Sequence, residues 1–166
     1  MSIYVAKTRE KFLAADRVWI AVALLHRENP NRKGFSLKEI QERARQEGFL
    51  EEGANTFYVH ANQHCVANRP PNPGNHRMLT EVEGGQRRLY RNGDTCKPGR
   101  TGKITPDPNA IPAKYRPLID WYDNWNKRSS SPRVIDPLLR LIGSGKDIWK
   151  DEHADEYVNR LREGWE

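Results

Sequence analysis

A pair of adjacent glycines, Gly84 and Gly85, constrains the fold more than any other feature of this chain. They stand inside the stretch HRMLTEVEGGQRRLYRNGD (76–94), where apolar and polar residues are interspersed on both sides of the pair. Glycine readily takes the positive φ angles that a tight turn between antiparallel strands requires. The stretch therefore predicts a β-hairpin whose turn is formed by the two glycines.

Two helices are predicted well before this hairpin. Asp16 is a suitable N-cap for a helix over 16–27, where apolar residues recur at helical spacing. A second helix begins at Ser36, because Ser36 and Glu39 form the Ser-x-x-Glu pattern of a capping box. Gly48 is expected to end it as a C′ glycine.

A third helix is expected over 55–68, with one apolar side and one polar side. The apolar side is predicted to hold Tyr58, Val59, Ala61, Cys65 and Val66. The polar side is predicted to hold Thr56, His60, Gln63 and Ala67, with His64 at its edge.

The order of elements is helix, a short strand at Phe35, two helices and a hairpin, which is the layout of a winged helix-turn-helix domain. We therefore expect an α+β fold over 1–95, with three helices and a β-hairpin wing, followed by a helical C-terminal extension that binds a partner. Such a domain places its third helix in the DNA major groove and its wing against phosphates. The predicted DNA-binding residues are Thr56, His60, Gln63, His64, Arg69, Arg77, Arg87, Arg88 and Arg91, with the three wing arginines pointing outward.

The polar face of the third helix is equally typical of a solvated helix, and winged helices also bind proteins. The predicted helix contains no Lys or Arg, so DNA binding would depend on the wing and on helix-end amides.

Positive charge is concentrated in the first part of the chain. Residues 1–128 carry 22 Lys and Arg against 14 Asp and Glu, whereas residues 129–166 carry 6 against 8. This balance serves solubility, or it attracts a polyanion such as nucleic acid or an acidic protein surface. The two cysteines and the absence of a long apolar run favour a reduced, cytoplasmic protein without a membrane segment or signal peptide.

The remaining chain divides by composition into three further parts. Residues 96–128 form a Pro- and Gly-rich wrap followed by a fourth helix within 112–127. Residues 129–142 form a flexible, serine-rich joint and a short helix, and residues 143–166 form a tail. The sequence leaves open whether 98–127 belongs to the core or only braces it.

Catalytic and metal motifs are absent or incomplete. His60 and His64 share a helix side, but the downstream Cys and His spacings match no common zinc pattern. A His-Asn-His nuclease needs its residues spread over a hairpin and a following helix, and here the hairpin comes last. The segment 143–146 (GSGK) lacks the other residues of a phosphate-binding loop. We predict no enzyme, no metal and no cofactor, with a metal nuclease as the minor alternative.

The tail is amphipathic. Tyr157, Val158, Leu161 and Trp165 fall on one helical stripe, and Ile148 and Trp149 form a separate apolar anchor. Acidic residues precede the stripe and Arg160 and Arg162 lie in its last turns, in accord with the helix dipole. Trp and Arg are enriched at binding hot spots, which favours a partner-binding helix.

Residues 136–166 resemble the C-terminal neutralising tail of type II antitoxins of the VapB kind, in the run LLRLIGSGKDIW, the step DEYV and the end RLREGW. The resemblance implies a PIN-domain ribonuclease toxin as partner, with Arg160 or Arg162 entering its acidic, metal-binding active site and Trp149 and Trp165 as anchors. The implied toxin-binding residues are Ile148, Trp149, Tyr157, Val158, Arg160, Leu161, Arg162 and Trp165.

The front of the chain departs from that family, whose DNA-binding domains are usually small swapped hairpins or ribbon-helix-helix folds. Here the segment 64–79 (HCVANRPPNPGNHRML) resembles a largely uncharacterised prokaryotic winged-helix family. The sequence thus predicts an antitoxin that inhibits a PIN-type ribonuclease and binds operator DNA, as a homo-oligomer or a hetero-oligomer with its toxin. The alternative is a winged-helix transcription factor or protein-interaction module whose last helix docks on its own domain.

Overall fold

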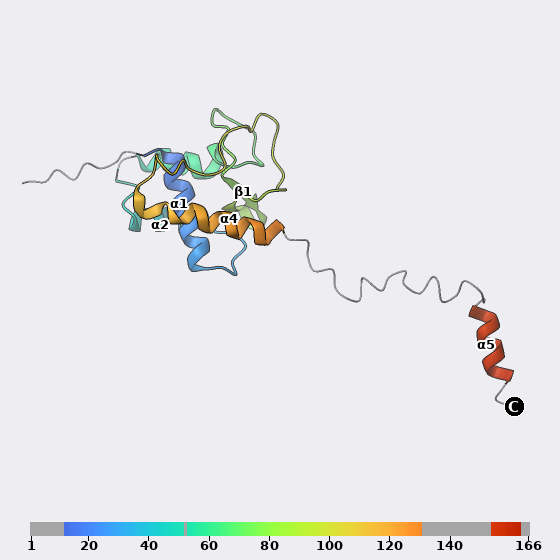
Figure 1. The fold of residues 1–166 in the computed structure, drawn as a ribbon. Coiled ribbons are helices and arrows are strands. Elements are labelled where there is room, and N and C mark those ends of the chain that lie inside the picture. Colours follow the sequence, from blue (N-terminus) through green and yellow to red (C-terminus); the bar gives the residue numbers. More distant parts are fainter. Residues whose placement is uncertain (1–11, 52, 131–153, 164–166) are drawn as a thin grey trace, which may run out of the picture. The chain divides into compact units, whose positions relative to one another are not determined.

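The computed structural model describes residues 12–51, 53–130 and 154–163 (Figure 1). The chain divides into two units, Met1–Ser130 and Ser131–Glu166. We call the described residues of the first unit the body; those of the second unit form one helix. The predictions for Ile148, Trp149, Trp165 and the short helix within 129–142 lie outside the described residues.

The fold is α+β. The body contains α1 (Ala14–Glu28), α2 (Leu37–Gln46), α3 (Ala54–Val59), a π-helical turn (His60–His64), β1 (Leu79–Val82), a 3-10 turn (Glu83–Gly85), β2 (Gln86–Leu89), a second 3-10 turn (Ala113–Tyr115) and α4 (Pro117–Ser130). The second unit contains α5 (Ala154–Glu163). Three helices followed by a hairpin are compatible with the predicted winged-helix layout. None of the described helices is long and apolar enough to cross a bilayer.

Helix α1 forms the centre of the body, and α4 packs against it through the edge-to-face pair Trp19–Tyr122, whose ring centroids are 5.6 Å apart (Figure 1). The helix begins two residues before the predicted N-cap, so that prediction is wrong: Asp16 lies within the first turn and is fully buried. Its carboxylate accepts a hydrogen bond from Lys103, a partner that local sequence does not reveal.

Helix α2 has the start and end that its sequence predicts. Ser36 Oγ accepts a hydrogen bond from the Glu39 amide at 3.3 Å, and Glu39 Oε2 accepts one from the Ser36 amide at 2.8 Å. Both halves of the capping box are therefore formed. Gly48 follows the C-cap residue with φ of 76°, as a C′ glycine does.

The third helix is shorter than predicted. It ends at Val59 and passes into the π-helical turn, in which the Cys65 amide donates to the His60 carbonyl. Beyond it the backbone turns to the hairpin, because Val66 forms a parallel bridge with Leu79. The Ala67 amide donates to the Leu79 carbonyl, and the Asn68 side chain exchanges hydrogen bonds with the backbone of Glu81, so this segment pairs with β1 rather than continuing a helix.

The buried side of α3 also differs from the prediction. Phe57, Ala61 and Cys65, spaced four residues apart, are buried, whereas Tyr58 and Val59 are 41% and 42% exposed. Phe57 is the largest of these three buried side chains. Its four-residue spacing to Ala61 is visible in the sequence and is the signal that indicates this buried side.

The hairpin is confirmed. Strands β1 and β2 are antiparallel, with Leu79 opposite Leu89 and Val82 opposite Gln86, and Gly84 and Gly85 have φ of 72° and 70°. Phe35 forms a single antiparallel bridge with Arg87 rather than a strand of several residues.

Residues 96–130 belong to the body. The Lys97 amide donates to the Ala67 carbonyl, and the Tyr122 hydroxyl donates to the Tyr90 carbonyl at 2.5 Å. Leu118 and Tyr122 of α4 are buried in the same core as α1. Because α4 continues to Ser130, the first two residues of the predicted joint are helical.

Candidate nucleic-acid interface and partner-binding helix

The predicted DNA-reading residues of the third helix are largely occupied within the protein. Of the four, only Thr56 is exposed; His60, Gln63 and His64 are half-buried. Gln63 Nε2 donates to the Pro70 carbonyl at 2.6 Å, and His64 Nδ1 accepts from the Gly74 amide at 3.1 Å. The loop after the helix thus covers the side that was expected to face DNA.

His60 does not supply positive charge near neutral pH. Burial, followed by repulsion from His64 and His76, lowers the pKa of His60 to about 4. Its Nδ1 lies 3.7 Å from the buried Sγ of Cys65. His60 is therefore neutral at pH 7 and offers no ionic attraction to a phosphate.

Arg87 points into the protein, so the prediction that it faces outward is wrong. Its side chain is 1% exposed, and its guanidinium donates to the Asn62 carbonyl and side-chain oxygens at 3.4 Å and 3.2 Å. Glu81 Oε1 lies 3.3 Å from the same guanidinium, and Arg69 pairs with Glu81 on its other side. The reason is strand alternation: Arg87 and Leu89 share the buried face of β2.

The remaining predicted arginines also have partners in the body. Arg88 forms a bidentate ion pair with Asp94: Nη1 donates to Oδ2 at 2.7 Å and Nη2 donates to Oδ1 at 2.6 Å. The Arg91 guanidinium lies 4.1 Å from the centre of the Trp125 ring. Arg77 Nε donates to the Gly102 carbonyl at 3.1 Å. These side chains organise the wing and the loops around it.

A further arginine, which sequence reasoning overlooked, clamps the loop beside the third helix. Arg100 is 4% exposed and donates to five backbone carbonyls, at 2.6–3.1 Å. The acceptors are the carbonyls of Gln63, His64, Arg69, Pro70 and His76. Nothing in the Gly- and Pro-rich segment around Arg100 distinguished it from a solvated cation.

The face formed by α3 and the wing tip is therefore poor in positive charge. Between 53 and 86 the only basic residues other than histidine are Arg69 and Arg77, both half-buried and hydrogen-bonded. Glu51 and Glu83 are exposed at the start of α3 and at the wing tip. Apart from Thr56, the predicted DNA-binding residues make contacts within the body.

The second unit contains α5, which covers residues 154–163 of the predicted tail. Val158 is 43% exposed on α5, and Arg160 and Arg162 are exposed in its last turn. The backbone of Tyr157 and Leu161 lies in the same helix; their side chains are outside the described set. The two arginines thus lie in the last turn of α5, where positive charge suits the helix dipole.

Among the residues that the structure describes, no three His, Cys, Asp or Glu side chains gather to hold a metal ion. Burial raises the pKa of Cys65 to about 12, so this thiol stays protonated. The chain matches no protein-family model, no curated protein and no solved structure.

Proposed function

We propose that this protein is the antitoxin of a type II toxin–antitoxin system, whose tail binds and inhibits a PIN-type ribonuclease. The resemblance of residues 136–166 to antitoxin tails carries the proposal. Helix α5 supports it, because it contains the DEYV step and the RLRE part of the final motif and exposes Arg160 and Arg162 in its last turn.

The chemistry of inhibition follows from the charges. A PIN-type active site is acidic and binds metal, and a guanidinium pairs with two carboxylate oxygens at once. An arginine in such a site takes the carboxylates that would otherwise hold Mg²⁺. Val158, exposed on the same helix, supplies apolar contact area next to the arginines.

The second part of the proposal is that the body is a winged helix that binds operator DNA in the cytoplasm. The helix order and the antiparallel hairpin are compatible with that fold. The excess of 22 Lys and Arg over 14 Asp and Glu in residues 1–128 supports a polyanionic partner.

The test is co-expression of the full chain with the PIN-type ribonuclease encoded next to it, followed by co-purification and an RNA-cleavage assay. We expect a stable complex without ribonuclease activity. The double variant R160A/R162A should restore cleavage more than it weakens binding, because the apolar anchors remain. Asn159→Ala, exposed on the same helix, is the matched control and should inhibit as the unmodified chain does.

Cleavage that persists with the full chain in excess would contradict the proposal. Removal of residues 143–166 separates it from the alternative of a self-docked helix. A self-docked helix stabilises the body, so its removal would lower Tm by several degrees. A helix reserved for a partner leaves Tm unchanged.

A further inference from the structure

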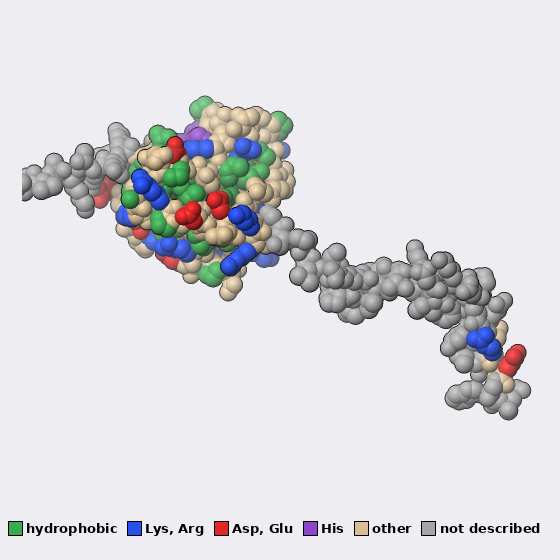
Figure 2. All heavy atoms as spheres, in the orientation of Figure 1, with side chains coloured by type: hydrophobic (Ala, Val, Ile, Leu, Met, Phe, Trp, Pro, Cys, Tyr) green, Lys and Arg blue, Asp and Glu red, His purple; other side chains and the backbone are tan. Residues whose placement is uncertain are grey.

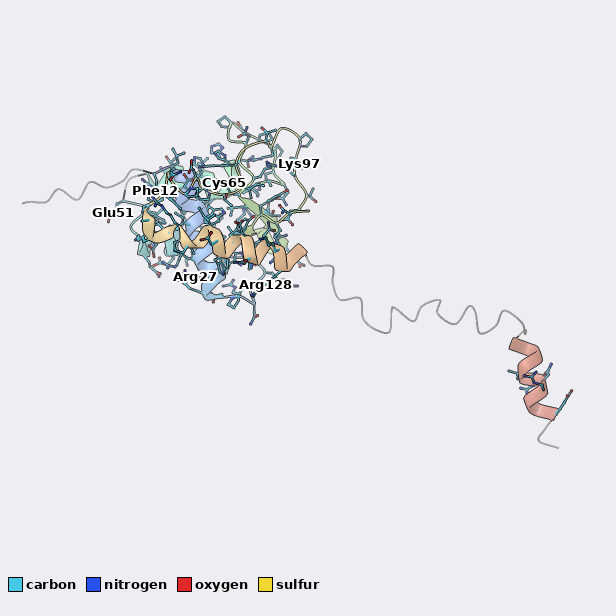
Figure 3. All side chains as sticks on the ribbon, in the orientation of Figure 1. Phe12, Arg27, Glu51, Cys65, Lys97 and Arg128 are labelled. Atoms are coloured by element: carbon cyan, nitrogen blue, oxygen red, sulfur yellow. The ribbon has the colours of Figure 1, made fainter. Side chains whose placement is uncertain are left out.

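Cations gather where the C-terminal ends of α1 and α4 meet. This surface is not the one that the predicted winged-helix layout would place on DNA. His26 of α1 and Trp125 of α4 bring these ends together, with ring centroids 5.1 Å apart. Arg27 and Arg128 lie at the two helix ends (Figure 3). We call the surface formed by Arg27, Lys33, Arg91, Lys127 and Arg128 the basic edge.

A stack of rings and guanidinium groups fixes this surface. Arg91 lies over Trp125 at 4.1 Å, Trp125 contacts His26, and His26 packs edge-on against Phe35 at 4.9 Å. Arg32 covers the other end of the stack, 4.6 Å from the Phe35 ring centre. Arg27 follows the stacked residue His26, and Lys33 follows the stacked residue Arg32. The stack therefore holds together residues 26–35, Arg91 and the end of α4.

The positive charge of the basic edge is only partly neutralised. Arg32 pairs with Glu39 and Arg88 with Asp94, and neither pair is counted in the five cations. Asp123 is exposed one helical turn before Lys127 and offsets one charge. Glu28, the last residue of α1, pairs with Arg43, which is not counted in the five cations either. Two helix C-termini contribute about one further negative charge, and the basic edge keeps a net positive charge. Figure 2 shows basic side chains beside the end of α4 in this part of the body.

His26 does not add to this charge. Burial, followed by repulsion from Arg91, Arg88 and Arg32, lowers its pKa to about 3, so it is neutral at pH 7. Burial is the largest cause of this shift, so His26 contributes no charge to the basic edge. The face of α3 and the wing tip shows the opposite balance, with exposed Glu51 and Glu83.

We infer that the basic edge, rather than the exposed side of α3, makes the phosphate contacts by which the body binds double-stranded DNA. This inference rests on the proposed DNA binding and assigns it to a surface. Exposed Lys and Arg side chains at two adjacent helix ends match the closely spaced phosphates of a duplex, with one charge per ~1.7 Å of helix axis. The favoured partner is a duplex because the Trp125 face is covered by Arg91 and offers no platform for an unstacked base.

Binding of this kind depends on backbone charge and is strongly salt-dependent. Each phosphate contact contributes about 0.9 to the slope of log affinity against log salt concentration. Loss of three cations from the basic edge should therefore reduce that slope by up to about 2.7. The same loss should weaken binding to the operator and to an unrelated duplex alike.

The test measures fluorescence anisotropy of a labelled duplex from the region upstream of the gene, titrated with the full chain at several salt concentrations. The edge variant is R27Q/K127Q/R128Q. The matched control is R45Q/K97Q/K114Q, which removes the same charge from exposed positions; Lys97 lies well away from Arg27 and Arg128 in Figure 3. A third variant, T56A/Y58A, alters the exposed side of α3. Circular dichroism checks that each variant is folded.

We expect the edge variant to lose affinity by tenfold or more and to show the lower salt slope, while the control and T56A/Y58A stay within twofold of the unmodified chain. Loss of affinity in T56A/Y58A with an unchanged edge variant would overturn the inference and leave the proposed DNA binding intact. Tighter binding of the single strand than of the duplex would overturn the choice of duplex. An unmodified chain that binds no duplex would contradict the proposed DNA binding itself, whatever the tail does to a ribonuclease.

Discussion

Lys103 donates a 2.5 Å hydrogen bond to Asp16, whose carboxylate is fully buried in the first turn of α1. The pair joins the Gly- and Pro-rich segment to the central helix across 87 positions of the chain. The other oxygen of Asp16 has no hydrogen-bond partner in the body. Lys103 is therefore the cation that makes this buried charge tolerable.

Removal of that cation should destabilise the body strongly. Lys103→Met leaves the Asp16 carboxylate buried without its counter-ion, at a cost of about 3–5 kcal/mol in the free energy of unfolding. Urea denaturation followed by circular dichroism measures the change. Adding Asp16→Asn to the same chain should recover much of the loss, and a double variant as unstable as the single one would contradict the role given to the pair.

Arg100 should be hard to replace even by lysine. Lysine has three donors on one point charge, whereas the Arg100 fork reaches five carbonyls. Because a buried hydrogen bond to a charged group contributes about 1.5–3 kcal/mol, Arg100→Lys should cost at least 2 kcal/mol, and Arg100→Met more. Hydrogen exchange should show the loss first in the amides of residues 69–76. Lys97→Gln, a nearby exposed change, is the control and should leave both readouts unaltered.

The free energy of unfolding should decrease in acid because of His26. In the unfolded chain this histidine binds a proton near pH 6.5, whereas in the folded body its pKa is about 3. The unfolded state thus binds more protons between these values, and stability falls as pH decreases through 6.5 toward 3. The expected loss at pH 5 is about 2 kcal/mol. His60, with its pKa lowered to about 4, acts in the same direction.

Denaturation curves between pH 7.5 and 4.5 test this expectation. His26→Gln keeps an acceptor for the Leu89 amide and removes the titrating group, so its curve should be flatter. A steep decline that is unchanged in His26→Gln would assign the acid sensitivity to other groups.

Two glycines should respond differently to substitution. A Cβ added at Gly74 would lie 2.4 Å from the Cβ of His64, so Gly74→Ala should displace the loop from the third helix. At Gly84 nothing lies within 4 Å, and the constraint is the positive φ of 72°. Gly84→Asn should therefore cost less than about 1 kcal/mol, because asparagine tolerates this region. Melting temperatures of the two variants provide the comparison, and equal losses would contradict it.

Features set by neighbouring residues were predictable from the sequence. The capping box of Ser36 and Glu39 and the turn at Gly84 and Gly85 need only the residues that form them, and both are present. The fourth helix and the α5 helix follow from apolar periodicity in the same way. The proposed partners of α5 remain predictions.

Features set by distant residues were not predictable. From local sequence Asp16 resembles an N-cap, and its actual partner, Lys103, lies 87 positions away. The third helix ends early because Val66 pairs with Leu79. Arg87 is an intermediate case. Strict alternation along β2 places it on the side of Leu89, but a buried arginine is acceptable only with Glu81 and Asn62 near it, and their proximity depends on the fold.

The clamp formed by Arg100 also affects the order in which the body folds. Its acceptors lie 24 to 37 positions earlier in the chain, so the loop that they belong to gains its hydrogen bonds only after a long segment has closed. During synthesis the third helix and the start of β1 leave the ribosome before Arg100 does. The π-helical turn that carries His60 and His64 can therefore gain its Arg100 hydrogen bonds only after residue 100 has been made, although the turn is encoded near the middle of the body.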